Sequence, residues 1–93
     1  MGGMEFIWNR GNAEHVAKHG VSPPEAEYVV ENARPPYPRM IGEGKRLVVG
    51  QLADGRYVQV IYVPSRLVPG AVYVMHSRSL TDREKRRFRR RTR

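Results

Sequence analysis

Residues 45–78 carry the sequence KRLVVGQLADGRYVQVIYVPSRLVPGAVYVMHSR, the stretch that decides the fold. Its β-branched and aromatic side chains gather in three runs, each of which predicts a strand: 45–53, 56–64 and 71–78. Asp54-Gly55 separates the first two runs and is typical of a tight turn between antiparallel strands. This stretch therefore predicts an antiparallel meander.

Two capping patterns predict helices on either side of the meander. Ser22 and Glu25 stand three residues apart around a pair of prolines, so their side chains can accept hydrogen bonds from N–H groups that the first helical turn leaves free. Thr81 and Glu84 repeat this spacing and predict a C-terminal helix. Phe88 is the only large apolar residue of that helix, which otherwise continues into arginines.

The first twenty residues predict a strand and a short helix. Residues 5–9 are rich in aromatic and β-branched side chains, which favour a strand. Asn9 or Asn12 can cap a helix over residues 13–19, and Gly20 can end that helix in a left-handed conformation.

Together these elements predict an α+β fold with a small, largely antiparallel sheet of three or four strands, two short helices before the meander and one basic helix after it. A chain of 93 residues is expected to form a single domain, residues 1–93, in which residues 1–4 are flexible and residues 89–93 form an Arg-rich tail. We expect the core to contain Trp8, Val29, Val48, Val60, Ile61, Val74 and Phe88.

The composition excludes several classes of site. Cysteine is absent, so disulfide frameworks, Cys-ligated zinc, iron–sulfur clusters and thiol nucleophiles are excluded. No apolar run approaches the roughly 20 residues that a membrane span requires, and the N-terminus lacks the apolar region of a signal peptide. We therefore expect a cytoplasmic protein.

The charge of the chain is concentrated at its C-terminus. The formal net charge is +8, and residues 78–93 hold nine Lys and Arg against two Asp and Glu, a net charge of +7. Most of the cations are arginines, whose planar fork of donors fits phosphate with two hydrogen bonds. The C-terminal segment therefore predicts binding to a polyanion, with a solubilising or partner-docking tail as the alternative.

Alternation along the strands groups side chains that could share a ligand. Val72, Val74, His76 and Arg78 have the same parity and are expected on one face of the last strand. If the start of the first meander strand lies near the end of the third, Arg46 and Arg78 could together clamp a phosphate. Alternatively, both arginines are solvated residues at strand ends.

His15 and His19 stand four residues apart, the spacing of a paired metal ligand on a helix. The glutamate of the His-Glu-x-x-His pattern is missing and spacing nominates no third ligand, so no metal site is predicted. Lys18 and His19 instead occupy the last helical turn, where the helix dipole favours cations. His76 is a candidate general acid or base, or a half-buried structural histidine.

Four blocks of the sequence carry a resemblance to a known family: Phe6-Ile7-Trp8-Asn9, Lys18-His19-Gly20-Val21-Ser22 before Glu25-Ala26, Arg46 at the start of a strand that reaches Gly50, and His76-Ser77-Arg78-Ser79-Leu80-Thr81-Asp82-Arg83-Glu84. With these blocks, residues 5–90 resemble the BrnT family of bacterial toxins. The resemblance implies a RelE-like fold and a toxin of a type II toxin–antitoxin system.

The resemblance also implies an activity. A BrnT-like protein is expected to be an endoribonuclease that inhibits translation, works without metal or cofactor, and cleaves RNA by attack of the ribose 2′-hydroxyl on the adjacent phosphate. It implies that Lys18, His19, Arg46 and Arg78 are catalytic residues, and we infer that Lys18 or His19 transfers protons while Arg46 and Arg78 stabilise the phosphate. We expect RNA to be bound by Arg83, Arg86, Arg87 and Arg90.

The resemblance further implies partners. A BrnA-like antitoxin is expected to bind and neutralise the protein, either as a toxin–antitoxin hetero-oligomer or beside a homo-oligomer of the toxin, and no membrane is involved. Asn9 and Asn12 stand where the family usually has an acid and a lysine. The alternative is therefore a degenerate toxin, a non-catalytic basic module that binds nucleic acid or a protein partner.

Overall fold

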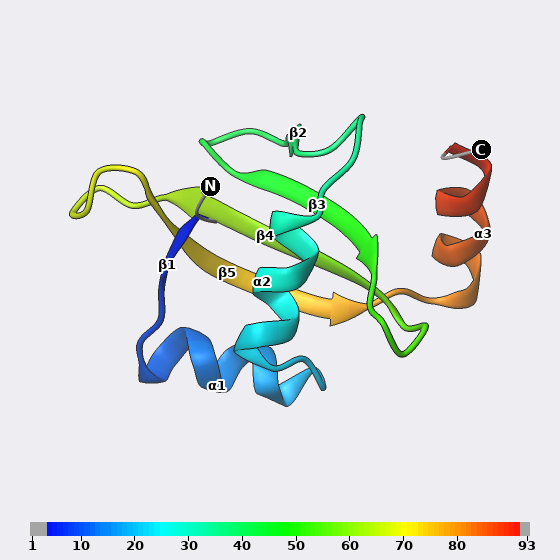
Figure 1. The fold of residues 1–93 in the computed structure, drawn as a ribbon, viewed down its shortest axis with the longest axis horizontal. Coiled ribbons are helices and arrows are strands. Elements are labelled where there is room, and N and C mark those ends of the chain that lie inside the picture. Colours follow the sequence, from blue (N-terminus) through cyan, green and yellow to red (C-terminus); the bar gives the residue numbers. More distant parts are fainter. Residues whose placement is uncertain (1–3, 92–93) are drawn as a thin grey trace.

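A computed structural model describes residues 4–91, which contain three helices and five strands (Figure 1). In chain order these elements are β1 (Glu5–Ile7), α1 (Arg10–Lys18), α2 (Pro23–Glu31), β2 (Arg39–Met40), β3 (Arg46–Gln51), β4 (Tyr57–Pro64), β5 (Ala71–Ser79) and α3 (Asp82–Arg91). The predicted α+β class is confirmed. Residues 1–3, which belong to the segment predicted to be flexible, and residues 92–93 of the predicted tail lie outside the described residues.

The strands form one mixed sheet in the order β1-β5-β4-β3-β2. The predicted meander is confirmed, because β3 pairs antiparallel with β4 and β4 with β5. The sheet has five strands rather than three or four, because β1 adds to β5 in parallel and the two residues of β2 add to β3. The N-terminal strand therefore lies beside the last one.

Helices α1 and α2 cover one face of the sheet (Figure 1). Predicted core residues Val29, Val48, Val60 and Val74 are buried between these layers. The other three predicted core residues, Trp8, Ile61 and Phe88, are only half-buried. Gly50 faces α2, where a Cβ added at this position would lie at an ordinary contact distance, 3.5 Å, from Cγ1 of Val29.

All three helix starts use reciprocal side-chain caps. Asn9 caps α1, whose first residue is therefore Arg10 rather than residue 13, and Asn12 completes this capping box. The capping box predicted at Ser22 and Glu25 is confirmed. The one predicted at Thr81 and Glu84 is also confirmed, in the hydrogen bonds from N–H of Thr81 to Glu84 and from N–H of Glu84 to Thr81 Oγ1.

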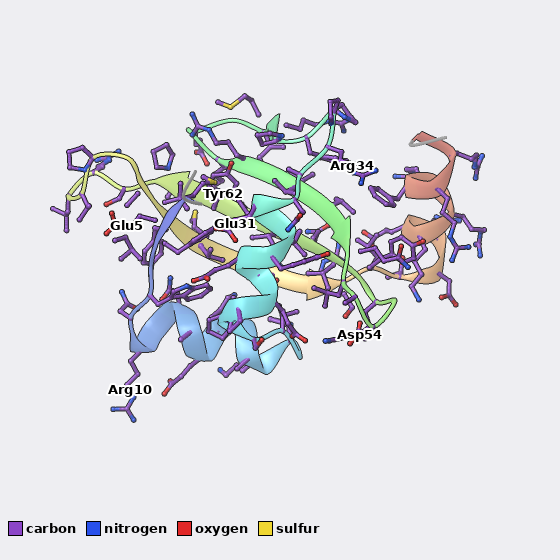
Figure 2. The ribbon with its side chains drawn as sticks, viewed as in Figure 1. Glu5, Arg10, Glu31, Arg34, Asp54 and Tyr62 are labelled. Carbon is purple, nitrogen blue, oxygen red and sulfur yellow. The ribbon has the colours of Figure 1, made fainter. Side chains whose placement is uncertain are left out.

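Arg56 joins the β3–β4 turn to the start of α2. Its Nε donates to Oδ2 of Asp54 at 2.9 Å, at the turn where Figure 2 labels Asp54. Its Nη1 donates to the carbonyl of Gly20 at 2.9 Å, and its Nη2 donates to Oε2 of Glu25. These bonds stabilise both carboxylates in their charged form, and the pKa values of Asp54 and Glu25 are lowered by backbone hydrogen bonds and by Arg56.

A register shift interrupts the alternation of β5. Val74 pairs with Tyr62 while His76 pairs with Ile61, so that Met75 has no partner in the ladder. Beyond this irregularity Ser77, not His76, takes the fully buried position. The predicted common face of residues 72, 74, 76 and 78 is therefore wrong, because an extra residue in one strand reverses the parity that follows it.

Helix α3 lies beyond the end of β5 (Figure 1). Phe88 packs against the rings of Tyr57 and Tyr37, with centroid separations of 5.6 and 6.1 Å. The predicted Arg-rich tail is helical as far as Arg91. Within residues 4–91, no helix combines the length and the apolar character needed to cross a membrane.

Candidate functional site

Asn12 fastens α1 to the edge of the sheet. Strand β1 pairs with β5 only as far as Tyr73, and at the next residue the Nδ2 group of Asn12 donates to the carbonyl of Val74 at 3.1 Å. The same group donates to the carbonyl of Ile7 at 3.0 Å, and Oδ1 accepts from N–H of Asn9 at 2.8 Å. The Asn12 side chain is almost completely buried. It therefore fixes the position of α1 relative to both β1 and β5.

This attachment brings all three histidines of the chain together. His15 lies in α1, His19 is the residue that ends α1, and His76 lies in β5 next to the unpaired Met75. Nε2 of His15 lies 3.3 Å from Nδ1 of His76. The three ring centroids are 5.3 to 5.5 Å apart, and one ring nitrogen from each histidine lies within 4.8 Å of the other two. We call His15, His19 and His76 the histidine cluster.

The histidine cluster contains imidazoles in different environments. His15 and His19 are exposed and His76 is half-buried. Burial lowers the pKa of His76, and the positive charges of His19, His15 and Arg78 lower it further. Because burial and like charge both disfavour the imidazolium, the lowered pKa favours the neutral ring of His76, whose lone pair can accept a proton or bind a metal. The cluster can therefore combine a base with neighbouring groups that can carry a proton.

Lys18 lies beside His19 in the last turn of α1 and is exposed. The carbonyl end of the helix favours a cation at this position. Lys18 and His19, the predicted proton-transfer residues, are therefore adjacent at the histidine cluster. His15 and His76 were not predicted to join them, because spacing along the chain could not show that β5 passes beside α1.

Arg78, the predicted phosphate ligand, follows His76 by two residues but is bound by a carboxylate. Its Nη1 and Nη2 donate to the two oxygens of Glu84 at 2.8 and 2.7 Å, and Nη1 also donates to the carbonyl of Ser79. The Arg78 guanidinium and the N–H of Thr81 lower the pKa of Glu84 to about 2. The fork of Arg78 therefore holds the start of α3, and a phosphate would have to displace Glu84 to bind both of its outer nitrogens.

Arg46 lies apart from Arg78, and the predicted clamp is wrong. Strands β3 and β5 run in the same direction, so Arg46 is level with Tyr62 whereas Arg78 is level with Gln59. This register separates the two arginines by three residues along the strands, about 10 Å, and by two strand spacings. They also project from opposite faces, because Arg46 pairs with the buried Tyr62 and Arg78 pairs with the half-buried Gln59.

The predicted RNA-binding residues Arg83, Arg86, Arg87 and Arg90 are exposed on α3. Arg87 also lines a hollow of about 200 Å³ that Arg39, Gln59 and Phe88 share. A neighbouring cavity of about 600 Å³ contains further aromatic and basic side chains: Tyr28, Arg34, Tyr37 and Phe88. Aromatic rings beside arginines suit the stacking of unpaired bases.

Neither hollow is lined by a member of the histidine cluster. The candidate chemistry and the candidate binding surface therefore lie in separate places, joined by β5, which carries His76 and leads to α3. No family model, curated protein or solved structure was found to match the chain.

Proposed function

We propose that the protein is a metal-independent endoribonuclease toxin with a RelE-like fold, as its resemblance to the BrnT family implies. The observation that carries this proposal is the histidine cluster, in which His19 meets two further imidazoles and His15 lies 3.3 Å from His76. Neighbouring imidazoles can act as general base and general acid near neutral pH. The exposed arginines of α3 would hold the RNA backbone.

In the proposed reaction a neutral imidazole takes the proton of a ribose 2′-hydroxyl. The 2′-oxygen then bonds to the adjacent phosphorus, and the bond from phosphorus to the 5′-oxygen breaks as a second, protonated imidazole gives its proton to that oxygen. The products are a 2′,3′-cyclic phosphate and a 5′-hydroxyl. His76, whose pKa is lowered, suits the role of base, and the exposed His19 suits the role of acid.

The charge that develops on the phosphate requires a cation nearby. Lys18 is adjacent to His19 and forms no ion pair with a carboxylate within residues 4–91, whereas Arg78 is bound to both oxygens of Glu84. We therefore assign phosphate stabilisation first to Lys18. The charge of Arg78 acts on His76, whose pKa it lowers, and Arg46 lies outside this arrangement.

Single-turnover cleavage of an end-labelled single-stranded RNA in EDTA tests the proposal. His19→Ala and His76→Ala should each slow cleavage by about 10²-fold or more, the usual contribution of a proton-transfer group. Arg66→Ala, which removes an exposed arginine from the β4–β5 loop, is the control and should cleave as the unmodified protein does. Detection of the cyclic phosphate end identifies the chemistry.

The alternative is a basic module that binds RNA or a protein partner without cleavage. The pairing of Arg78 with Glu84 and its separation from Arg46 favour this alternative. RNA binding without any cyclic phosphate product would establish it and contradict the nuclease. As a toxin, the protein would act in the cytoplasm and be neutralised by a BrnA-like antitoxin, so expression alone should arrest growth and coexpression of that antitoxin should restore it.

A further inference from the structure

We propose that His15, His19 and His76 form a binding site for one divalent transition-metal ion of the zinc type. This site goes beyond the proposed function, which uses the imidazoles for proton transfer and does not require a metal. The three residues are all the histidines of the chain, and they come from α1 and its C-terminal end on one side and from β5 on the other, with His15 and His76 61 residues apart in the sequence.

The spacing of the ring nitrogens fits tetrahedral coordination. With zinc–nitrogen bonds of about 2.0 to 2.1 Å, two ligand nitrogens on a tetrahedron are separated by about 3.3 to 3.4 Å. The 3.3 Å separation between Nε2 of His15 and Nδ1 of His76 already matches this value. The remaining separations do not exceed 4.8 Å, and the exposed His19 can close them by rotation of its side chain.

The chemistry of the ligands selects the class of metal. Neutral imidazoles suit zinc, copper and nickel, whereas calcium and magnesium prefer oxygen ligands. Among the described residues, the cluster that could hold an ion consists of histidines without a carboxylate. Three protein ligands leave a fourth tetrahedral position for water or an anion, as in open zinc sites.

The site is also held in place before a metal arrives. The side chain of Asn12, in α1, donates a hydrogen bond to the carbonyl of Val74, two residues before His76. This bond holds the helix that carries His15 against β5. Such support orients ligands and strengthens binding. Because a bound ion would occupy the lone pairs that the proposed nuclease uses, zinc should inhibit cleavage and EDTA should relieve the inhibition. Only this last expectation rests on the proposed function.

Titration of the full chain with Zn²⁺, followed by calorimetry without RNA, tests the inference. We expect one ion per chain, and His15→Ala and His76→Ala should each weaken binding by at least about 10-fold, since even residues that only support metal ligands contribute this much. Met75→Leu, a change beside His76 that leaves all imidazoles in place, is the matched control and should bind within about twofold of the unmodified protein. Co²⁺ bound in the site should show the visible absorption of a tetrahedral complex.

A thermal melt with and without Zn²⁺ gives a second measurement. Zinc should raise the Tm of the unmodified protein and of Met75→Leu but not of His15→Gln or His76→Gln, which serve if the alanine variants do not fold. Equal zinc affinity in the histidine variants and the unmodified protein would overturn the inference. Zinc binding without RNA cleavage would support the metal site and contradict the proposed nuclease activity. RNA cleavage in EDTA without zinc binding would support the nuclease activity and contradict the metal site.

Discussion

Replacement of Asn12 by alanine should detach α1 from the sheet and destabilise the whole domain. The substitution removes the acceptor for N–H of Asn9 and the donors for the carbonyls of Ile7 and Val74. The bond to Val74 is buried, and a buried acceptor without a partner costs about 1 to 3 kcal/mol. The other two bonds are partly buried and contribute about 0.5 to 1 kcal/mol each.

The free energy of unfolding should therefore fall by about 2 to 5 kcal/mol, against a total of about 5 to 14 kcal/mol for a chain of this length. This loss corresponds to a decrease in Tm of about 10 to 40 °C. Urea unfolding, followed by far-UV circular dichroism and by the fluorescence of Trp8, measures it. Trp8 is the only tryptophan and lies between β1 and α1, so its emission reports the region that should loosen.

Asn9→Ala is the matched control, because it removes the cap of the same helix and leaves the bonds to Ile7 and Val74 intact. Loss of a cap costs about 1 kcal/mol. If Asn12→Ala is no more destabilising than Asn9→Ala, other contacts hold α1 in place and the role assigned to Asn12 is wrong. Where Asn12→Ala still folds, its zinc affinity should fall by about 10- to 100-fold, because Asn12 orients the histidine cluster.

Three further predictions concern charged residues. The pKa of Glu84 is lowered from 4.5 to about 2, so its contribution to stability is present above pH 4.5 and is lost as the pH falls towards 2. The free energy of unfolding of Glu84→Gln, measured as a function of pH, should therefore decrease less over that range than that of the unmodified protein. Arg46→Ala should cleave RNA within about threefold of the unmodified rate, because Arg46 lies away from the reacting groups. A loss of about 100-fold would show instead that Arg46 takes part in the reaction. Deletion of residues 89–93 removes four arginines, and the slope of log affinity against log salt on single-stranded RNA should decrease by about 3 if all four contact phosphate, whereas an unchanged slope would assign them to a protein partner.

The parts of the fold that depend on neighbouring residues were predictable from the sequence. The Asp54-Gly55 turn fixed the pairing of β3 with β4, and the capping boxes at Ser22 and Thr81 located two helix starts. The parallel pairing of β1 with β5 was not predictable, because it joins residues more than sixty positions apart and no turn or spacing records it. The same holds for the unpaired Met75, since an extra residue in a strand leaves no mark on the pattern of side chains.

The candidate site was predictable only in its separate pieces. His19 was predicted as a site residue, and the spacing of His15 and His19 on one helix face was evident from the sequence. The position of His76 beside them was not predictable, because His76 lies in β5, a different element. The proposed clamp of Arg46 and Arg78 failed for a geometric reason. In a meander of three strands, the first and third run in the same direction, so the start of one is level with the start of the other.

The bond from Asn12 to Val74 and the pairing of β1 with β5 also bear on the order in which the chain can fold during synthesis. The first eighteen residues, which include β1 and α1, leave the ribosome long before the strand that they pack against has been made. They must wait while β3 and β4 form a hairpin from neighbouring residues, and they can dock only once β5 has emerged. The histidine cluster therefore cannot assemble on any nascent chain that stops short of His76, and neither proton transfer nor metal binding at this site can begin before the sheet is complete.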